Sequence, residues 1–404
     1  MNDLRILLID TGICGDINTS GAIEYSVYNI SKELSMLGYE VIVLTNIAYN
    51  ENVIKNNLAI LTAKLPSIFI KAKNTISMIT IAEYKFLQII RNIIKEYNID
   101  VIHTHSEPIA LLLLPIVKRF KSKITFVHTY HNAPPNVLRR DTLWRQTIGL
   151  INYRAMGLIF DYYDYIVVPS NYVKNGIVHY FGDKYLDKVT VIPNGVDTNF
   201  FNFKLKNKKN RIREVFERIY TPNLQDSYVL LYSGRIEKTK GVHILPLLLY
   251  NNKIRSKKMN IKLVIVGRGS YENQLMTSLK DFHNDILKMP WSPRYILRFI
   301  YALSDLLLFP SIGEGCPLTP LEAMATGLPV VGFTIEPLIE ILNGSHLLEL
   351  LAKNVKEFIN KTFWLLENED MLKKLSTEAT ILAQKYSWSN IVYKYITLYE
   401  KKYV

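Results

Sequence analysis

Two glutamates eight positions apart, Glu314 and Glu322, stand in and just after a glycine-rich loop and could act on one bound molecule. The loop follows an apolar run at 305–309, and a helical pattern begins a few residues after it. Two turns of α-helix take about seven residues, so side chains at this spacing lie on nearly the same face. We therefore expect the two carboxylates to face one cleft.

A second loop carries two fixed positive charges that suit a diphosphate. It spans residues 233–241, follows the apolar run 229–232 and contains Arg235 and Lys240 beside a predicted helix start. Arginine can bind phosphate oxygens through two parallel N–H groups, lysine adds a point charge, and a helix end offers unpaired N–H groups. A solvated basic turn would have the same residues, since arginine and lysine are common on surfaces. Both interpretations stay open at this point.

Glycines follow two further apolar runs. Gly267 and Gly269 come after the run 262–266, and a lone G-x-G is weak evidence for a backbone that approaches a ligand closely. The loop 10–20 follows the first apolar run of the chain, residues 4–9. It leads into Gly21 and Ala22 and contains no G-x-G-x-x-G. The absence of that fingerprint argues against hydride transfer with a dinucleotide.

The histidines do not form a metal-binding pattern. His103 and His105 alternate at the end of an apolar run and therefore lie on one side of it, without an acidic or cysteine partner in the pattern. We expect structural hydrogen bonds from this pair rather than metal ligation. His131, taken alone, is better explained as a surface or hydrogen-bonded histidine than as a catalytic one.

The elements that must position these residues are short apolar runs that alternate with helical patterns. The first such unit has a run at 4–9, a helical face with apolar residues at spacings of three and four, and a run at 41–44. Further runs follow at 99–102, 124–127, 166–168, 189–192, 229–232, 262–266, 305–309 and 329–333, with helical segments such as 141–160 between them. Continuous apolar strands that alternate with helices indicate a parallel sheet covered on both faces.

The character of the chain changes after residue 195, where a lysine- and arginine-rich stretch at 204–218 separates two such series. We therefore predict an α/β protein with two Rossmann-like, doubly wound parallel-sheet domains, 1–200 and 201–386. The segment 387–404 has an apolar helical stripe that needs a partner surface. We expect it to pack back on the N-terminal domain.

Composition narrows the protein classes. The chain has 404 residues, 49 Lys and Arg against 36 Asp and Glu, and a net charge of +13. Two cysteines, Cys14 and Cys316, exclude a disulfide framework and a structural zinc site and suit a reducing compartment. The longest apolar run, 108–117, is shorter than the roughly 20 residues of a membrane span, and no signal peptide is visible. We expect a cytoplasmic protein, and its charge suits nucleic acid, an anionic membrane or phosphorylated molecules.

Seven short motifs occur in an order that resembles the nucleotide-sugar-dependent glycosyltransferases of the GT-B fold, specifically family 4. The motifs are SGAIE at 20–24, DVIHTH at 100–105, VHTYH at 127–131, PNGVD at 193–197, GR at 234–235 with KG at 240–241, VGRG at 266–269, and the two glutamates at 314 and 322. Each motif is weak alone, but the resemblance covers nearly the whole chain.

The resemblance implies a donor sugar nucleotide held mainly by the C-terminal domain and an acceptor held mainly by the N-terminal domain. Arg235 and Lys240 match the residues that neutralise the donor diphosphate, which is also the leaving group. Glu322 matches the carboxylate that accepts hydrogen bonds from the ribose hydroxyls, and Glu314 matches the one directed at the transferred sugar. His131 matches the active-site histidine beside that sugar.

The resemblance also implies that backbone groups of the donor loops approach the ligand. The residues concerned are Gly21, Gly267, Gly315, Cys316, Pro317 and Leu318. Cys316 would act through its backbone and not as a nucleophile. Ala22 stands where the family usually has a second glycine, which adds a methyl group near the expected phosphate.

The resemblance implies a retaining, metal-independent reaction. Negative charge grows on the departing diphosphate in the transition state, and two cationic side chains can stabilise that charge without a divalent metal. No DxD-type carboxylate pair is placed to hold one, so we expect no metal and no cofactor. A conventional double displacement would need a carboxylate nucleophile, which the family generally lacks. We therefore expect same-face attack, in which a donor phosphate oxygen helps to deprotonate the acceptor hydroxyl.

We expect the protein to move a hexose-type sugar from a UDP- or GDP-sugar to a hydroxyl of a glycan, lipid-linked or polysaccharide acceptor. A disaccharide or sugar-phosphate synthase of the same fold is the nearest alternative. A catalytically idle nucleotide-sugar-binding protein or a nucleic-acid-binding protein would belong to another class. No RNA or DNA module is recognisable, so we expect no nucleic-acid partner.

Basic residues cluster in the N-terminal half and allow peripheral contact with an anionic membrane. They are Lys118, Arg119, Lys121 and Lys123, together with Arg139, Arg140 and Arg145, which lie around the aromatic residue Trp144. Each basic residue near such a surface adds on the order of 1 kcal/mol of attraction. A solvated surface explains the same residues equally well.

Overall fold

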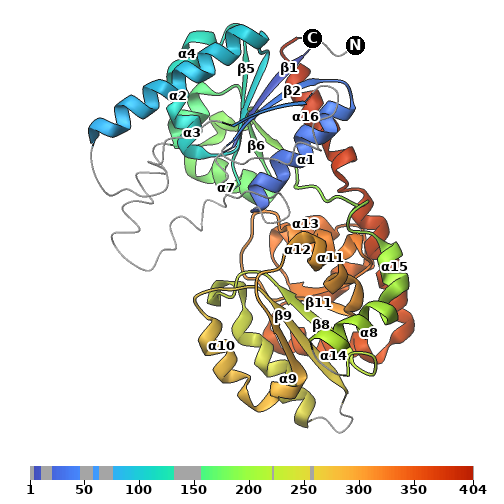
Figure 1. The fold of residues 1–404 in the computed structure, drawn as a ribbon. Coiled ribbons are helices and arrows are strands. Elements are labelled where there is room, and N and C mark those ends of the chain that lie inside the picture. Colours follow the sequence, from blue (N-terminus) through green and yellow to red (C-terminus); the bar gives the residue numbers. More distant parts are fainter. Residues whose placement is uncertain are drawn as a thin grey trace. The chain divides into compact units, whose positions relative to one another are not determined.

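The computed structural model describes residues 4–10, 21–45, 58–62, 76–131, 156–220, 223–254 and 259–403. Two compact units make up the chain (Figure 1). The first unit contains residues 1–193 and 388–404, and the second contains residues 194–387. None of the helices in the described ranges is both long and apolar enough to cross a membrane.

The first unit is built on a seven-stranded, all-parallel sheet with the strand order β3-β2-β1-β4-β5-β6-β7. The strands are β1 (Arg5–Ile9), β2 (Glu40–Thr45), β3 (Leu58–Thr62), β4 (Val101–Thr104), β5 (Thr125–Thr129), β6 (Tyr165–Val168) and β7 (Val189–Val191). The helices are α1 (Ala22–Met36), α2 (Ile76–Tyr97), α3 (Glu107–Leu112), α4 (Leu114–Phe120), a helix at 156–162, α7 (Asn171–Phe181), the 3₁₀ turn η4 (Asp183–Tyr185) and α16 (Trp388–Glu400).

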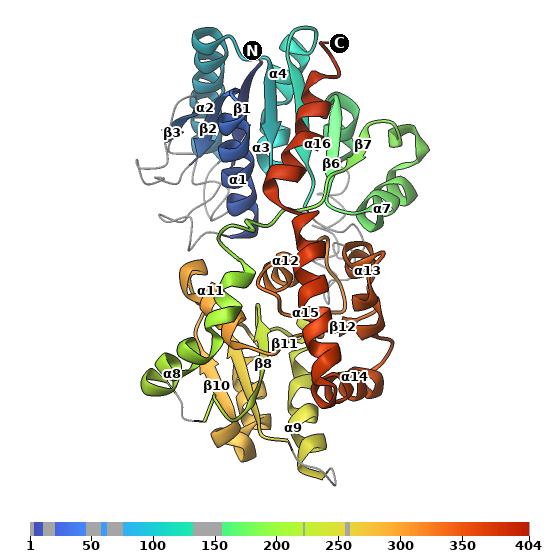
Figure 2. The same cartoon turned by 90° about the vertical axis from the view of Figure 1, so that its right-hand side faces the viewer.

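Both faces of this sheet are covered, as continuous apolar strands require. Successive side chains of a strand point to opposite faces. Accordingly, Leu7 and Ile9 of β1 join one core with α2, α3, α4 and α7, while Ile6 and Leu8 join another with α1 and α16. The C-terminal helix α16 packs beside α1 (Figure 2) and buries an apolar stripe that begins at Trp388. This is the helix that the sequence pattern placed at 387–404.

The second unit has a six-stranded, all-parallel sheet with the order β10-β9-β8-β11-β12-β13. The strands are β8 (Tyr228–Ser233), β9 (Ile261–Val266), β10 (Ile286–Met289), β11 (Leu306–Phe309), β12 (Val330–Phe333) and β13 (Leu351–Ala352). The α-helices are α8 (Lys209–Ile219), α9 (Leu245–Ile254), α10 (Glu272–Ser278), α11 (Arg294–Leu303), α12 (Leu318–Ala325), α13 (Glu336–Leu342), α14 (Val355–Glu367) and α15 (Glu369–Gln384). The 3₁₀ turns are η5 (Phe203–Lys208), η6 (Lys238–Lys240), η7 (Val242–Ile244), η8 (Lys280–Asp285) and η9 (His346–Leu350).

The prediction of two Rossmann-like parallel-sheet domains is confirmed. The strands absent from the prediction are β3, β10 and β13, and all three lie at sheet edges. Of these, β10 carries Lys288 and β13 has only two residues, so neither forms a long apolar run. Of the helical segment predicted at 141–160, residues 156–160 are helical, and residues 141–155 lie outside the described ranges.

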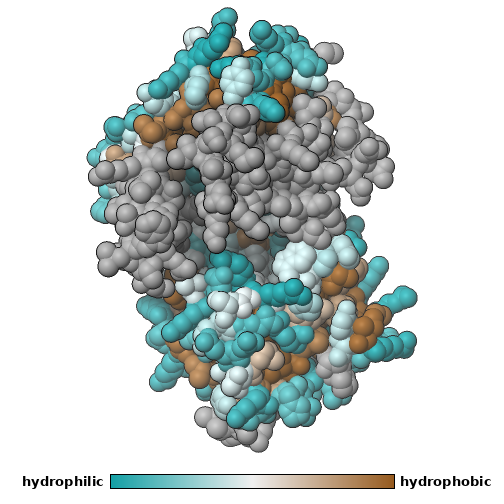
Figure 3. Space-filling view, turned by 60° about the vertical axis from the view of Figure 1, so that its left-hand side comes forward, coloured by the Kyte–Doolittle hydropathy of each residue, from teal (hydrophilic) through white to brown (hydrophobic). Residues whose placement is uncertain are grey.

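The division between the units falls after residue 193, whereas the sequence analysis placed it after residue 200. Residues 194–200 belong to the second unit because the backbone N–H of Val196 donates to the Tyr386 carbonyl at 2.8 Å, next to the start of α16. Phe201, fully buried in the core of the second unit, completes the attachment. On the face of that unit seen in Figure 3, hydrophilic residues lie around separate hydrophobic areas, as is usual for a surface that faces water.

Candidate active site

The predicted donor residues follow the carboxyl ends of neighbouring strands in the second unit. Arg235 and Lys240 come after β8, Gly267 after β9, and Glu314 after β11. Because these strands are parallel and adjacent in the order β9-β8-β11, their ends share one edge of the sheet. Ligands of open parallel sheets bind at this edge.

Two glycines let the loops at this edge pack backbone against backbone. A Cβ on Gly267 would lie 1.9 Å from the Gly234 carbonyl oxygen, and one on Gly241 would lie 1.9 Å from the Pro310 carbonyl oxygen. Gly241 also has a φ of +71°, which disfavours any other residue. Gly267, predicted as a donor contact, therefore has a structural role in joining the β8 and β9 loops.

Lys240 and Glu314 form an ion pair across two of these loops. Lys240 Nζ lies 2.6 Å from Glu314 Oε1, and the Ser311 hydroxyl donates to the same oxygen at 2.7 Å. The two side chains are only 20% and 15% exposed, so the lysine is held in one position by a charge-assisted hydrogen bond. An incoming diphosphate would compete with the carboxylate for this ammonium group.

Arg235 is the more accessible of the two cations. Its side chain is 68% exposed and pairs with Glu237 at 2.8 Å between Nη1 and Oε1. The Tyr232 hydroxyl donates to the Arg235 carbonyl at 2.6 Å and steadies the backbone of the loop. The guanidinium can therefore turn towards a ligand with little loss of internal contacts.

Glu322 lies on α12 and has different partners from Glu314. Glu322 is only 5% exposed. The Tyr301 hydroxyl donates to Glu322 Oε2 at 2.9 Å, and Arg294 Nε lies 3.7 Å from Glu322 Oε1. Burial raises the pKa of Glu322, and the charge of Arg294 and the Tyr301 hydrogen bond oppose that rise. The carboxylate is thus fixed in orientation before any ligand arrives.

Arg294 and Tyr301 are not among the residues predicted for the site. Both lie on α11, seven positions apart, which is about two helical turns and places them on one face. Their spacing on one helix was the available signal, but the same helix also carries Tyr295 and Arg298. That spacing pointed to a buried polar partner but not to Glu322.

The segment from Gly315 to Leu318 runs from the β11 loop into α12. The Asn194 amide donates to the Cys316 carbonyl at 2.7 Å and anchors the middle of this segment. Burial raises the pKa of the Cys316 thiol to about 12, so the thiol stays protonated and is a poor nucleophile. Pro317 is the N-cap residue of α12 and Leu318 is its first residue, so backbone N–H groups start the helix at this loop.

In the first unit, Gly21 and Ala22 begin α1. Gly21 has an extended backbone (φ −66°, ψ 179°) and therefore does not require glycine for its conformation. A Cβ on Gly21 would meet Glu24 Oε2 at 2.4 Å, so the Glu24 carboxylate lies beside the start of the helix. A phosphate group at this helix end would have to displace that carboxylate. The preceding loop, residues 11–20, lies outside the described ranges.

Four histidines lie at the ends of β4 and β5: His103, His105 and His131 contact one another, and His128, in register with Thr104, lies on the opposite face of the sheet beside the Tyr163 ring. His105 Nδ1 lies 3.2 Å from His131 Nε2, and the His103 and His105 rings lie with their centroids 4.1 Å apart. His103 is hydrogen-bonded to the Tyr399 and Thr129 hydroxyls, each at 2.7 Å, and His128 Nδ1 is 2.9 Å from Thr104 Oγ1. The structural hydrogen bonds expected of His103 are therefore present.

Burial holds the histidine cluster in its neutral form. It lowers the pKa of His131 to about 4 and contributes most to lowering that of His128 to about 3, which His131 also lowers. The pKa values of His103 and His105 also fall well below the ordinary value, first through burial and then through the other rings. A neutral His131 can donate one hydrogen bond and accept another at physiological pH.

Lowering the pH from 7 to 5 will destabilise the first unit. Between these values the unfolded chain protonates its histidines near pH 6.5, whereas the folded cluster stays neutral. The unfolded state then binds more protons than the folded state. The free energy of unfolding therefore has its full value above about pH 6.5, and below that pH it falls by on the order of 1 kcal/mol per buried histidine per pH unit. The unfolding midpoint in guanidinium chloride measures this loss.

A matched pair of variants tests the assignment of this pH dependence. His128→Asn, in the buried cluster, should make the midpoint less dependent on pH, while His179→Asn, on the exposed face of α7, should leave the dependence unchanged. An unfolding midpoint that stays constant from pH 7 to pH 5 would contradict the neutral cluster.

No group of three or more histidine, cysteine, aspartate or glutamate side chains suited to a metal ion occurs among the described residues. Metal independence stays a prediction. The residues proposed for membrane contact lie partly outside the described ranges, namely Arg139, Arg140, Trp144 and Arg145. Lys118 and Lys121 have intramolecular partners, since Lys118 Nζ lies 4.5 Å from the centroid of the Tyr162 ring and Lys121 donates to the Tyr162 carbonyl at 2.8 Å.

Two family descriptions match the two halves of the chain. "Glycosyltransferase Family 4" matches residues 23–200, and "Glycosyl transferases group 1" matches residues 217–381. Among curated proteins, a lipopolysaccharide 1,2-N-acetylglucosaminetransferase of Salmonella typhimurium is 28% identical over 247 residues, which cover 57% of this chain and 60% of that protein. The chain spans less than two thirds of the length of the first curated relatives it matches, with 60%, 58% and 53% covered.

Solved structures share the whole fold. Sucrose-phosphate synthase from Thermosynechococcus elongatus superimposes with a TM-score of 0.77 at 17% identity and covers 99% of both chains. HepE from Anabaena, in complex with UDP and glucose, gives a TM-score of 0.74 at 16% identity and covers 98% of this chain and 100% of that one. This likeness shows the GT-B fold, and the two family matches, which together cover most of the chain, show that it belongs to the family 4-type glycosyltransferases.

Proposed function

We propose that the protein is a retaining, metal-independent glycosyltransferase that moves a hexose-type sugar from a UDP- or GDP-sugar to an acceptor hydroxyl. The observation that carries the proposal is the Lys240–Glu314 pair at the edge of the second sheet, with Arg235 on the neighbouring part of the β8 loop. This arrangement sets positive charge where a leaving diphosphate can be bound and a carboxylate where a sugar hydroxyl can be bound.

Each residue then has a role that its surroundings support. Lys240 and Arg235 stabilise the negative charge that grows on the diphosphate, as preorganised donors do in other transfer reactions. Glu322, oriented by Tyr301, accepts hydrogen bonds from the ribose hydroxyls. Glu314 and the neutral His131 bind hydroxyls of the transferred sugar, and backbone groups of Gly315–Leu318, with Gly21 and Ala22, approach the donor.

The outcome at the anomeric carbon is retention by same-face attack. A donor phosphate oxygen takes the proton of the acceptor hydroxyl while the bond from the anomeric carbon to the leaving diphosphate breaks and the bond to the acceptor oxygen forms. The relative from Salmonella acts on lipopolysaccharide, and HepE is known in complex with UDP and glucose. We therefore propose a UDP-sugar as the first donor to test and a glycan or lipid-linked acceptor.

A panel of UDP-, GDP- and ADP-sugars tests this function through the thermal stability of the protein. A ligand that binds only the folded state increases the free energy of unfolding, by about 2.7 kcal/mol at a concentration 100 times Kd. The unfolding temperature rises accordingly. We expect one donor class to raise it in the wild type and not in Arg235→Ala or Glu322→Ala. With the donor known, the anomeric configuration of the product, measured by NMR, decides retention, and activity after treatment with EDTA decides metal independence. Stabilisation by no donor, with or without acceptor, would overturn the proposal.

A further inference from the structure

A pocket lies at the amino-terminal ends of the strands of the second sheet, opposite the carboxyl ends that carry the donor loops. It has a volume of about 400 Å³ and is lined by Tyr228 at the start of β8, Asp305 just before β11 and Pro329 just before β12. The 3₁₀ turn η5 and helix α15 supply its other walls. Since β8 has six residues and a strand rises about 3.3 Å per residue, the two sites are on the order of 20 Å apart.

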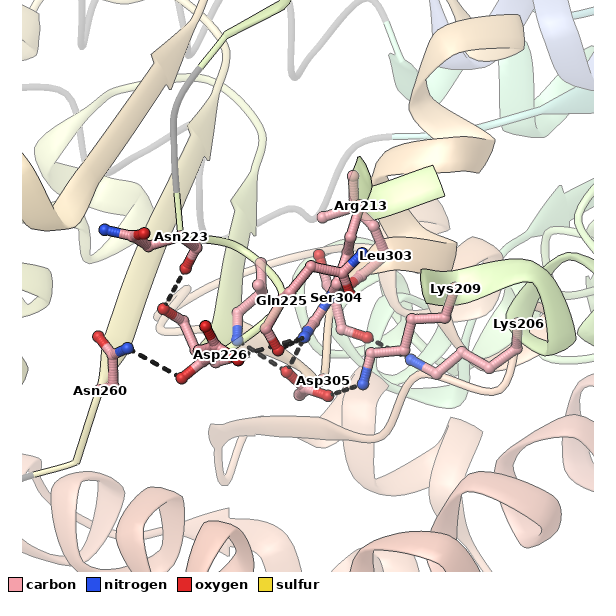
Figure 4. A network of polar contacts seen from close by, with 12 residues as sticks. Lys206, Lys209, Arg213, Asn223, Gln225, Asp226, Asn260, Leu303, Ser304 and Asp305 are labelled. Carbon is pink, nitrogen blue, oxygen red and sulfur yellow. Dashed lines mark hydrogen bonds and ion pairs between the residues drawn. The ribbon is translucent and has the colours of Figure 1, made fainter. Parts of the chain in front are cut away.

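The carboxylate that lines this pocket, Asp305, already has three partners in its own network (Figure 4). Lys209 pairs with Asp305 Oδ1, while Arg213 Nη2, at 2.6 Å, and the Val229 backbone N–H, at 2.7 Å, bond to Oδ2. Burial tends to raise the pKa of Asp305, but the three nearby cations lower it below its ordinary value. Asp305 is therefore ionised, and its negative charge is already shared by the cations that contact it.

The group left over is Lys206, whose ammonium donates to the Ser304 carbonyl in the same network (Figure 4). An ammonium group has three N–H donors, so one carbonyl does not saturate it. Burial lowers the pKa of Lys206 to about 7, and the charges of Lys209 and Arg213 lower it while Asp305 raises it. Lys206 thus lies in the wall of a pocket whose nearest carboxylate, Asp305, already pairs with Lys209 and Arg213.

The charges around the pocket leave a surplus of positive charge. Lys206, Lys209, Arg213 and Lys373 stand against the two carboxylates of Asp305 and Glu369, which gives +2 when Lys206 is protonated. The Lys373–Glu369 pair is exposed, at 4.0 Å, and contributes little to this balance. A phosphate monoester carries about −1.5 to −2 charge at pH 7 and would neutralise the surplus.

The remaining walls suit a small body attached to such an anion. Phe203, Pro329 and Leu372 are apolar, and Ser376 and Thr377 bring hydroxyl groups from α15. Gly327 shapes the wall, because a Cβ there would meet the Phe203 ring at 2.4 Å. We propose that this pocket binds a phosphorylated small metabolite, with its phosphate beside Lys206 and Lys209, at a site separate from the donor site.

Titration calorimetry at low ionic strength tests this site with inorganic phosphate, glycerol 3-phosphate and glucose 6-phosphate as probes, and with glycerol and glucose as uncharged controls. We expect a phosphate ester to bind and the uncharged controls not to bind. Lys206→Met should weaken that binding at least tenfold. Lys204→Met, on the exposed side of the same 3₁₀ turn, should change it less than twofold.

Two further measurements separate this site from the donor site. Saturating UDP should not displace the phosphate ester, and Arg235→Ala should leave its affinity within twofold. Thr377→Glu, which places a carboxylate at an exposed position of the pocket rim, should abolish binding even if Lys206→Met proves poorly folded. Binding that survives both Lys206→Met and Thr377→Glu, or that UDP displaces, would overturn the proposal, as would the failure of every phosphate probe to bind.

Proton uptake gives an independent signature. A bound anion raises the pKa of Lys206, so binding at pH 8 takes up a proton, while binding at pH 6 takes up much less. The other groups facing Lys206 are Asp305, Lys209 and Arg213, with Tyr228, Glu369 and Lys373 around the pocket. Binding heats measured in two buffers of different ionisation enthalpy report the uptake. It should disappear in Lys206→Met, and its absence from the wild type would contradict the placement of the phosphate.

Discussion

Replacing Lys240 by alanine will lower kcat/KM for sugar transfer by about 100- to 1,000-fold, the usual loss when one preorganised donor to a developing negative charge is removed. The ammonium group is held 2.6 Å from Glu314 and is largely buried, so it can act without reorganisation when the diphosphate departs. The variant also leaves Glu314 without its cation in a site that is only 15% exposed. Initial rates with the donor identified in the panel measure the effect.

Lys238 provides the matched control for this experiment. It lies on the same 3₁₀ turn, η6, two residues away, but its side chain is exposed and it makes no ion pair with Glu314. Lys238→Ala should keep kcat/KM within about threefold of the wild type, because exposed charges contribute little. A Lys240→Ala enzyme as active as the Lys238→Ala enzyme would remove Lys240 from the mechanism.

Glu314→Gln tests the other side of the pair. The glutamine keeps the shape and can still accept from the Ser311 hydroxyl, but it loses the charge that pairs with Lys240. Full transfer activity in this variant would count against a direct role for Glu314. A double-mutant cycle with Glu314→Gln and Lys240→Ala measures how much of the loss of activity comes from the interaction between the two side chains and how much from each side chain alone.

Replacing Gly241 by alanine will destabilise the second unit and disable the donor loop. The new Cβ would lie 1.9 Å from the Pro310 carbonyl oxygen and 2.7 Å from the carbonyl carbon, both of which are backbone atoms that cannot rotate away. The positive φ of +71° costs a non-glycine residue about 1 kcal/mol, and relief of the overlap adds about 2 kcal/mol or more. Gly241 is the C-cap of η6, so Lys240 would move with it.

Gly344→Ala isolates the conformational part of this cost. Gly344 has nearly the same backbone conformation, with a φ of +76°, but a Cβ added there would have no other atom within 4 Å. Its alanine variant should lose only about 1 kcal/mol and keep donor binding. The unfolding midpoint in guanidinium chloride and the thermal shift with donor compare the two. Equal losses in both variants would show that the contact with Pro310 does not constrain the loop.

Much of the fold could be predicted because its determinants are local. Apolar runs of a few residues separated by amphipathic helices predicted most strands of both sheets and the parallel topology. The edge strand β13 was not predicted, because a strand of only two residues, Leu351 and Ala352, is too short to give a recognisable pattern. The compact units divide after residue 193 and not after residue 200, because a contact of residues 194–200 joins Val196 to Tyr386, far along the chain.

The candidate site was predictable in its residue types and not in its pairings. Strand ends in a parallel sheet meet at one edge, so Arg235, Lys240 and Glu314 were expected near each other. That Lys240 bonds to Glu314, 74 positions away, depends on the strand order and on the close packing that Gly241 permits. The partners of Glu322 on α11 likewise came from tertiary packing.

The sequence by itself determined the fold class, the two-domain organisation, the terminal helix and the chemical types of the site residues, because hydrophobic periodicity and short motifs act over a few residues. The tertiary structure alone decided that the basic stretch at 204–218 is partly buried, with Arg213 only 4% exposed beside Asp305. It also decided that four histidines near the ends of β4 and β5 are held in the neutral form. In each case the decisive quantity is the burial of a charged or titratable group, which depends on packing between distant segments.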